Sequence, residues 1–145
     1  VDFDIARRVA VVMGKGLADI YEAPKDIVCG LLTYAFTRTA VKKMFALVTN
    51  PEADTDVVSL YIKATGLICA EIPLNENERG LDVRLTLDYP EDAEFFRRIY
   101  EVMPVDAGGS AIAAKALELG LTEINWYRQA DFFQNQQSFN EQVKI

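Results

Sequence analysis

The chain has 145 residues, 50% of them apolar, which is enough for a core, so we expect residues 1–145 to form a single domain. Asp and Glu number 22 against 15 Lys and Arg, a net charge of -7 that predicts repulsion from a phosphate backbone and argues against nucleic acid as a partner. The absence of histidine excludes serine–histidine, cysteine–histidine and zinc–histidine chemistry.

Charged residues interrupt each apolar stretch before it reaches about 20 residues, the length that spans a bilayer, so we expect no membrane segment. Two aspartates and two arginines occupy the first eight residues where a secretory signal carries a basic and then an apolar region. This start predicts a cytoplasmic protein. Cys29 and Cys69 lie in apolar stretches without the close pairing of a zinc site or disulfide scaffold, which predicts two buried free thiols.

Two amphipathic helices are predicted in the N-terminal half. Residues 3–13 carry apolar side chains at helical spacing, and Gly14 with Gly16 should end that helix. Residues 38–48 repeat the pattern, with basic side chains on the opposite face, up to the Asn-Pro pair that follows. Each helix should therefore pack one face on a core.

Strands are predicted between and after these helices. Residues 17–21 fit a short strand, and the apolar, partly aromatic run 27–36 is typical of a buried strand. Residues 58–64 leave two interpretations open. They form either a helix capped by Asp54 or Thr55, or a strand, since alternate positions are apolar.

The C-terminal half contains the clearest patterns. Residues 81–87 alternate apolar and polar side chains, which predicts a strand, and Pro90 followed by two acids predicts a helix over 90–102. A helix over 111–119 and a third amphipathic segment from residue 122 complete a mixed α/β chain with a helical tail. We expect the inward face of the helix at 90–102 to carry Ala93, Phe96, Ile99, Tyr100 and Met103.

Asp88 lies where the predicted strand ends and the chain turns into the next helix. The carboxyl ends of strands are where ligands gather in open α/β sheets. A carboxylate there suits magnesium, which takes one or two carboxylates together with phosphate oxygens and water. The alternative is that Asp88, Glu91 and Asp92 only cap the helix, and the spacing leaves both interpretations open.

A family resemblance is visible in this strand, turn and helix. The sequence RLTLDYPED over residues 84–92 resembles the C-terminal signature of the cytidylyltransferases that activate acidic and modified sugars, especially the branch of spore coat polysaccharide biosynthesis. Residues 30–45 and 56–62 resemble preceding segments of that family, and Ile124-Asn125 resembles a pair in its closing helices. The resemblance implies the C-terminal half of a Rossmann-like nucleotidyltransferase sheet, flanked by helices.

The resemblance also implies roles for three residues. Asp88 corresponds to an aspartate that binds Mg²⁺ beside the nucleotide phosphates and the sugar. Arg84 and Asp92 are expected to contribute to substrate binding, Arg84 by balancing the charge of the site, while Asp92 also caps the helix. No residue of this chain is expected to be catalytic. The implied substrates are CTP and a sugar, the implied cofactor is Mg²⁺, and a homodimer is a further expectation.

Some family features are missing from this sequence. The family begins with a strand and a glycine-rich, basic loop that grips the triphosphate, followed by a second metal-binding aspartate, and none of these precedes Val1. Val57 stands where the family usually has a histidine. We therefore expect the N-terminal nucleotide-binding half to be absent and the chain alone to be inactive.

Two functions follow from the sequence. The first is part of a CTP-dependent sugar nucleotidyltransferase that activates a sugar for surface polysaccharide or glycan synthesis. The alternative is a non-catalytic module for oligomerisation or partner docking. The aromatic residues of the tail fit either a partner-binding face or ordinary core packing, the interpretation we favour. They are Trp126, Tyr127, Phe132, Phe133 and Phe139.

Overall fold

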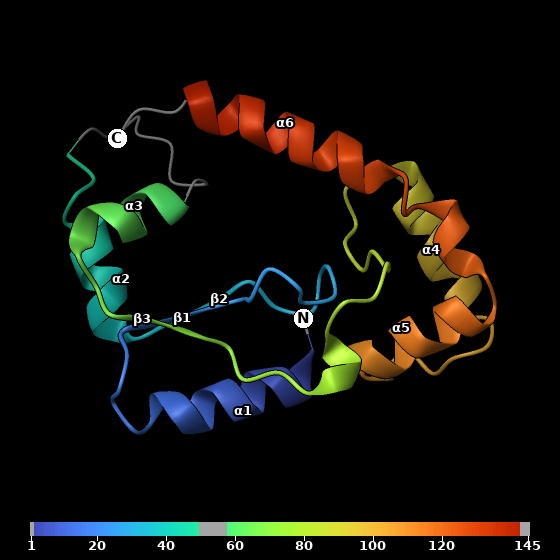
Figure 1. The fold of residues 1–145 in the computed structure, drawn as a ribbon, viewed down its shortest axis with the longest axis horizontal. Helices are drawn as coiled ribbons and strands as arrows, with labels where there is room; N and C mark the ends of the chain where they lie inside the picture. The colour runs from blue at the N-terminus through green and yellow to red at the C-terminus, as the bar shows by residue number, and fades with distance from the viewer. Residues whose placement is uncertain (1, 50–57, 143–145) are drawn as a thin grey trace.

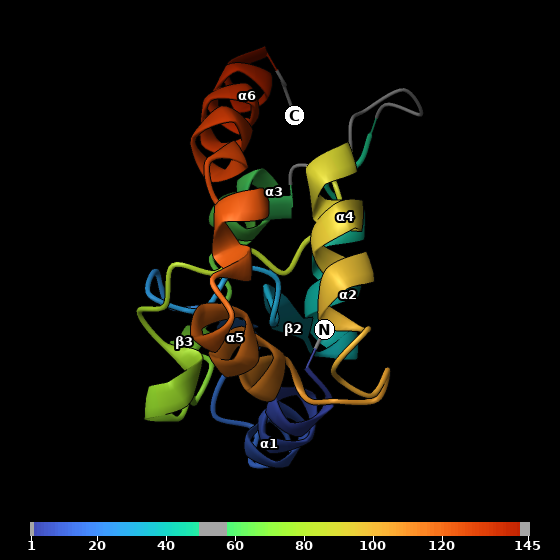
Figure 2. The same ribbon diagram turned by 90° about the vertical axis from the view of Figure 1, so that its right-hand side faces the viewer.

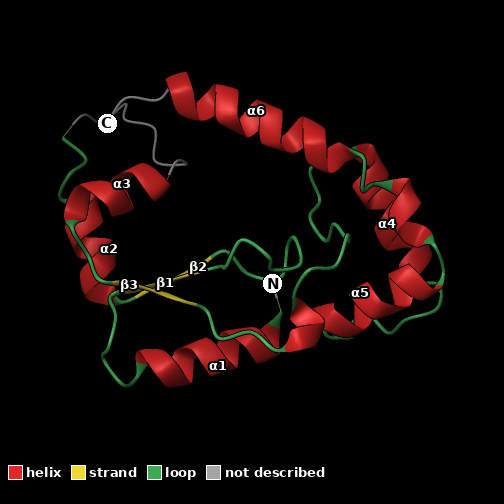
Figure 3. Cartoon of the chain, in the orientation of Figure 1, coloured by secondary structure: helices red, strands yellow, loops and turns green. Residues whose placement is uncertain are grey.

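A computed structural model describes residues 2–49 and 58–142, and in this part of the chain the fold is mixed α/β, as predicted (Figure 1). Helices predominate and the strands are short (Figure 3). The elements in chain order are α1 (Phe3–Met13), β1 (Ile20–Glu22), β2 (Tyr34–Phe36), α2 (Arg38–Phe45), α3 (Val58–Thr65), β3 (Cys69–Glu71), η1 (Glu76–Glu78), α4 (Pro90–Ile99), α5 (Gly109–Glu118), η2 (Leu121–Ile124) and α6 (Arg128–Gln142).

The three described strands form one small mixed sheet in the order β2-β1-β3. The central strand β1 pairs with β2 antiparallel and with β3 parallel. The strand predicted at 17–21 is therefore present but shifted toward the C-terminus. Cys69 lies on the edge strand β3 and is exposed, and Cys29 is only half-buried, so the prediction of two buried thiols was wrong for Cys69.

The first helix forms as predicted, and a side chain just before it explains where it begins. Asp2 Oδ1 accepts hydrogen bonds from the N–H groups of Asp4 and Ile5, at 2.9 and 3.0 Å, which caps α1. Asp2 Oδ2 accepts from Gly109 N at 2.7 Å, at the start of α5. One buried carboxylate therefore joins the N-terminal ends of two helices that are far apart in sequence.

The strand predicted over 27–36 was wrong except at its end, where β2 forms. The cause is Gly30, whose φ of 94° lies in the left-handed region that favours glycine. A Cβ at that position would lie 2.2 Å from the Leu85 carbonyl oxygen, so the two backbones cross closely there. Cys29 forms only an isolated bridge, to Arg84.

The same crossing explains why the prediction of a strand over 81–87 was also wrong. This segment contains one parallel bridge residue, Arg84, and Leu85 N donates to Cys29 O at 2.9 Å. Val83 points into the core as alternation requires, but Leu87 is exposed. The pattern identified Val83 as buried but not Arg84, and a regular ladder needs a neighbouring strand that the bend at Gly30 interrupts.

The helix interpretation of residues 58–64 is confirmed by α3, while the proposed caps Asp54 and Thr55 lie outside the described residues. The helix α2 begins at the predicted position, because Thr37 Oγ1 accepts from Ala40 N at 3.1 Å. It ends at Phe45, before the predicted residue 48. These two helices and β1 share a small apolar cluster formed by Ile20, Ala40 and Ile62.

The helix α4 begins at Pro90 as predicted and ends at Ile99, short of residue 102. Its buried stripe is Asp92, Phe95 and Ile99, so the expectation that Ala93 and Tyr100 face inward was wrong. The stripe is displaced by one position because Asp92 is drawn into a buried polar network. The main core lies between α4, α5, α1 and the sheet, and its largest buried side chains include Ile5, Ile72, Val83, Phe95 and Ile99.

The chain closes with α5, η2 and α6. Gly120, with a φ of 66°, ends the helix predicted at 111–119. Figures 1 and 2 show α6 at the opposite end of the molecule from α1. Trp126 and Phe132 are partly buried, but Tyr127, Phe133 and Phe139 are exposed, so core packing accounts for only part of the aromatic tail.

Within residues 2–49 and 58–142, every helix is too short or too polar to cross a lipid bilayer.

Candidate functional site

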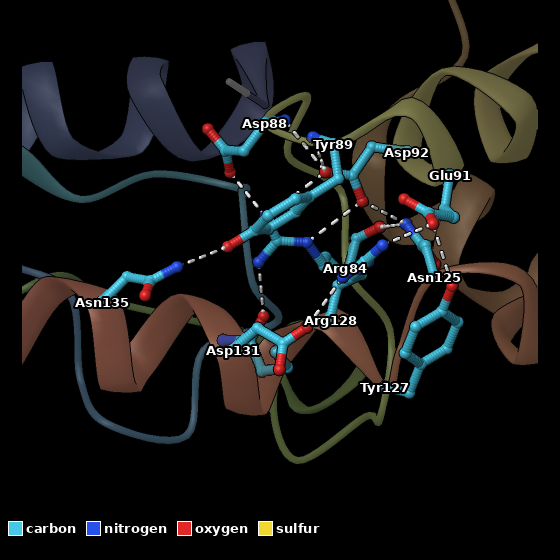
Figure 4. A network of polar contacts seen from close by, with 11 residues as sticks. Arg84, Asp88, Tyr89, Glu91, Asp92, Asn125, Tyr127, Arg128, Asp131 and Asn135 are labelled. Atoms are coloured by element: carbon cyan, nitrogen blue, oxygen red, sulfur yellow. Dashed lines mark hydrogen bonds and ion pairs between the residues drawn. The ribbon is translucent and has the colours of Figure 1, made fainter.

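The predicted site residues meet where the turn before α4 contacts the start of α6 (Figure 4). The side chain of Arg84 lies at the centre and is 0% exposed. Its Nε donates to Asp92 Oδ1 at 3.0 Å, its Nη2 to Asp88 Oδ2 at 2.5 Å, and its Nη1 to Gln129 Oε1 at 2.8 Å. A buried guanidinium is thus paired along its whole edge, as a buried charge requires.

Asp92 is the buried partner of this guanidinium and also the cap of α4. Its Oδ2 accepts from the backbone N–H groups of Asp88 and Tyr89, at 2.9 and 3.0 Å. Burial alone raises the pKa of Asp92, but the hydrogen bonds from Arg84, Asn125 and these backbone groups outweigh it and lower the pKa. The capping role expected for Asp92 is therefore present, within a network that reaches well beyond the cap.

Asn125, between η2 and α6, completes the buried network. Its Nδ2 donates to Asp92 Oδ1 at 2.9 Å and to the Arg84 carbonyl oxygen at 3.0 Å. Both acceptors lack a proton to give, which fixes which end of the amide is the nitrogen. Among the described residues, nothing donates to the buried Asn125 Oδ1. The amide joins the segment before α6 to both members of the central ion pair.

Two aromatic rings lie within cation–π distance of the central guanidinium. Arg84 Cζ lies 5.3 Å from the ring centroid of Tyr89 and 5.1 Å from that of Phe132. Arg128 makes two further contacts of this kind, with its Cζ 5.1 Å from the ring centroid of Tyr89 and 5.3 Å from that of Tyr127. Each such contact contributes about 0.5–2 kcal/mol, and together they attach α6 to the turn.

A second ion pair connects α4 with α6 nearer the surface. Arg128 Nη2 donates to Glu91 Oε1 at 2.7 Å, and Tyr127 Oη donates to the same oxygen at 3.1 Å. Hydrogen bonding from Arg128 lowers the pKa of Glu91 to about 2. Glu91 therefore stays ionised at neutral pH, and its carboxylate joins α4 to α6 while also accepting from its own backbone N–H in the first turn of α4.

Asp88 differs from its neighbours because solvent reaches it. Its side chain is 45% exposed, against 0% for both Arg84 and Asp92. One of its oxygens accepts from Arg84, which holds the carboxylate at the N-terminal end of α4. Asp88 is therefore the accessible carboxylate of the predicted site, and the other two residues lie behind it.

The residues fit magnesium in one binding mode only. No group of three or more Cys, Asp or Glu residues in the described part of the chain is arranged to hold a metal ion. Of the three predicted residues, only Asp88 offers an accessible oxygen, because Asp92 is buried and accepts five hydrogen bonds. Magnesium is often held by one or two carboxylates with phosphate oxygens and waters as its other ligands. The donor set fits a magnesium–nucleotide complex, not the bare ion.

The structure thus brings Arg84, Asp88 and Asp92 together, and it buries the side chains of Arg84 and Asp92. Sequence reasoning missed the residues that hold them from the other side of the junction. Gln129 and Arg128 look like solvated positions of a polar helix, and nothing in their local pattern signals a partner 45 or 37 residues away. Asn125 alone was noted, through the family resemblance.

No family model matches the chain, and no curated protein or solved structure matches it either.

Proposed function

We propose that this chain is part of a CTP-dependent sugar nucleotidyltransferase, in which Asp88 holds Mg²⁺ beside the nucleotide phosphates. The proposal depends on the exposure of the Asp88 carboxylate and on its ion pair with Arg84. This carboxylate is open to solvent, yet it is fixed by a guanidinium that is itself fully buried. A fixed, accessible carboxylate suits a cation, and the adjacent helix N-terminus suits the anionic phosphate oxygens that such a cation also binds.

The proposed reaction is an in-line attack of a sugar oxygen on the α-phosphate of CTP, with pyrophosphate leaving. Such transfers depend mainly on positioning and on neutralising the charge that develops on the phosphoryl oxygens. Magnesium supplies that neutralisation when bound. The contribution of this chain is to present one ligand oxygen in a fixed direction. Arg84 and Asp92 are proposed to act on the substrate side only through Asp88.

The proposal also includes the fold. The small mixed sheet is proposed to be the C-terminal part of a Rossmann-like sheet, to which a nucleotide-binding half would add strands. The chain has no counterpart of the family's triphosphate-gripping loop in its sequence. We therefore expect no turnover from this chain alone.

The test is CTP-dependent transfer by protein purified from its native source, so that whatever polypeptide carries these residues is assayed. Pyrophosphate release would be followed with Mg²⁺ and a panel of acidic and neutral sugars, and products would be identified by mass spectrometry. Formation of a cytidine monophosphate–sugar supports the proposal. Absence of any sugar-dependent pyrophosphate release across the panel contradicts it.

A non-catalytic docking or oligomerisation module is the second candidate, favoured by the exposed aromatic residues of α6. Phe133 is 61% exposed and Phe139 42% exposed, and Phe139 lies beyond Asn135, whose Nδ2 donates to Tyr89 Oη of the turn at 3.4 Å. Light scattering of the purified chain distinguishes the candidates. A dimer that Phe133→Ser dissociates, in protein without transferase activity, would favour the module.

A further inference from the structure

We infer that the N-terminal end of α6, together with Asn125, is the positioning element for Asp88; the consequence for metal binding rests on the proposed function. Asp88 is directed by one partner, the Nη2 of Arg84. The orientation of Asp88 therefore depends on the orientation of the Arg84 side chain. That side chain is 0% exposed, so protein groups rather than water set its orientation.

Residues 125–132 supply much of that orientation. Gln129 Oε1 accepts from Nη1 of Arg84 at 2.8 Å, on the edge next to the nitrogen that reaches Asp88. Phe132 covers one face of the guanidinium at 5.1 Å. Asn125 binds the Arg84 carbonyl oxygen and Asp92 at the same time. Because a guanidinium is planar, hydrogen bonds along its edge together with aromatic rings packed on it leave it little freedom to rotate.

A second ring near the guanidinium is that of Tyr89, 5.3 Å from Cζ, which belongs to the turn itself. The ring of Tyr89 is in turn held from α6, since Arg128 lies on it at 5.1 Å. The contacts therefore run from α6 to Arg84 and Tyr89, and from these to Asp88. Displacement of α6 would therefore leave the Asp88 carboxylate without a fixed orientation.

Two neighbouring phenylalanines provide a matched comparison. Phe132 contacts the guanidinium, whereas Phe133 is 61% exposed and packs against Phe132, with ring centroids 6.1 Å apart. Phe132→Leu and Phe133→Leu remove the same atoms from adjacent positions of one helix. Phe132→Tyr keeps the aromatic face and serves as the rescue. Gln129→Leu removes the acceptor from Arg84 at similar side-chain volume.

The first experiment needs no metal and measures hydrogen exchange of the Asp88 and Tyr89 amides, which donate to Asp92. Exchange should rise roughly 2- to 30-fold in Phe132→Leu, the range that loss of one cation–π contact implies, and should stay unchanged in Phe133→Leu and Phe132→Tyr. The amides of Phe95 and Ile99, deep in α4, report general loosening. An equal rise at those two amides, or no rise at the turn, overturns the inference.

The second experiment measures Mn²⁺ affinity in the presence of CTP by water-proton relaxation, in a cycle with Asp88→Asn. Phe132→Leu and Gln129→Leu should weaken Mn²⁺ binding in the wild-type background and have no effect in the Asp88→Asn background. A purely structural role would weaken binding equally in both backgrounds, which would overturn the inference. If Asp88→Asn alone leaves Mn²⁺ affinity unchanged, the proposed function fails, and the exchange data still decide whether α6 holds the turn.

Discussion

Replacing Asp92 by alanine tests whether the buried network is a principal source of stability. The change removes the acceptor for Arg84 Nε at 3.0 Å and for Asn125 Nδ2 at 2.9 Å. It also removes the cap that accepts from the N–H groups of Asp88 and Tyr89. The guanidinium, with an exposed fraction of 0%, would keep its charge but lose its buried partner.

Removing one member of a buried ion pair costs about 3–5 kcal/mol, because the remaining charge is left desolvated. Asp131→Ala is the matched control. Its carboxylate also pairs with an arginine, Arg128 at 2.9 Å, but is 49% exposed. An exposed pair of this kind contributes about 0–1 kcal/mol. The two alanine variants should therefore differ by at least about 2 kcal/mol in their free energy of unfolding.

Urea unfolding followed by circular dichroism gives both free energies by linear extrapolation. Small domains have about 5–15 kcal/mol in total, so the Asp92 variant should unfold at a much lower urea concentration than wild type. Equal losses in the two variants, or a loss below about 1 kcal/mol for Asp92→Ala, would refute the assignment of a tightly paired buried network.

Three further expectations follow from other parts of the structure. Burial alone would raise the pKa of Asp2, but hydrogen bonds from backbone N–H groups outweigh it and lower the pKa from its usual 3.8. The ionised carboxylate therefore stabilises the fold above that value, and this contribution is lost as pH falls further. The difference in free energy of unfolding between wild type and Asp2→Asn, measured by urea unfolding from pH 7 to pH 2, should therefore narrow in acid. Burial raises the pKa of both thiols, so exposure should decide their rates, and Cys69, which is exposed, should react with a thiol reagent well before the half-buried Cys29. Equal rates would be inconsistent with this difference in exposure. Gly30→Ala should lower the thermal midpoint more than Gly66→Ala, since both glycines have positive φ but only Gly30 would place a Cβ against another backbone, at 2.2 Å.

The helix boundaries that depend on local sequence were predicted well. Pro90 followed by acids begins α4, and Gly120 ends α5, because caps and positive-φ glycines act within a few residues of the boundary. The strands were predicted poorly. Alternation over 81–87 located the buried Val83, but pairing depends on a distant segment, and Gly30 bends that segment away.

In the site, too, the residues that are close in sequence were predicted and the distant ones were missed. Arg84, Asp88 and Asp92 are close in sequence, and their proximity in the fold was predicted from the turn between them. The residues that fix them arrive from beyond α5, through contacts that no local pattern encodes. Burial of Arg84 and Asp92 was also missed, because charged residues are ordinarily assigned to the surface unless a partner is known.

The proposed role of Asp88 as a ligand of the metal ion in a nucleotidyltransferase is tested most directly by Asp88→Asn in the active protein. Asparagine keeps an acceptor for Arg84, so the thermal midpoint should change little, while transfer from CTP at saturating Mg²⁺ should nearly disappear. Asp82→Asn, at an exposed position in the same segment, should retain full activity. Wild-type transfer rates in the Asp88→Asn variant would show that Asp88 does not bind the metal ion.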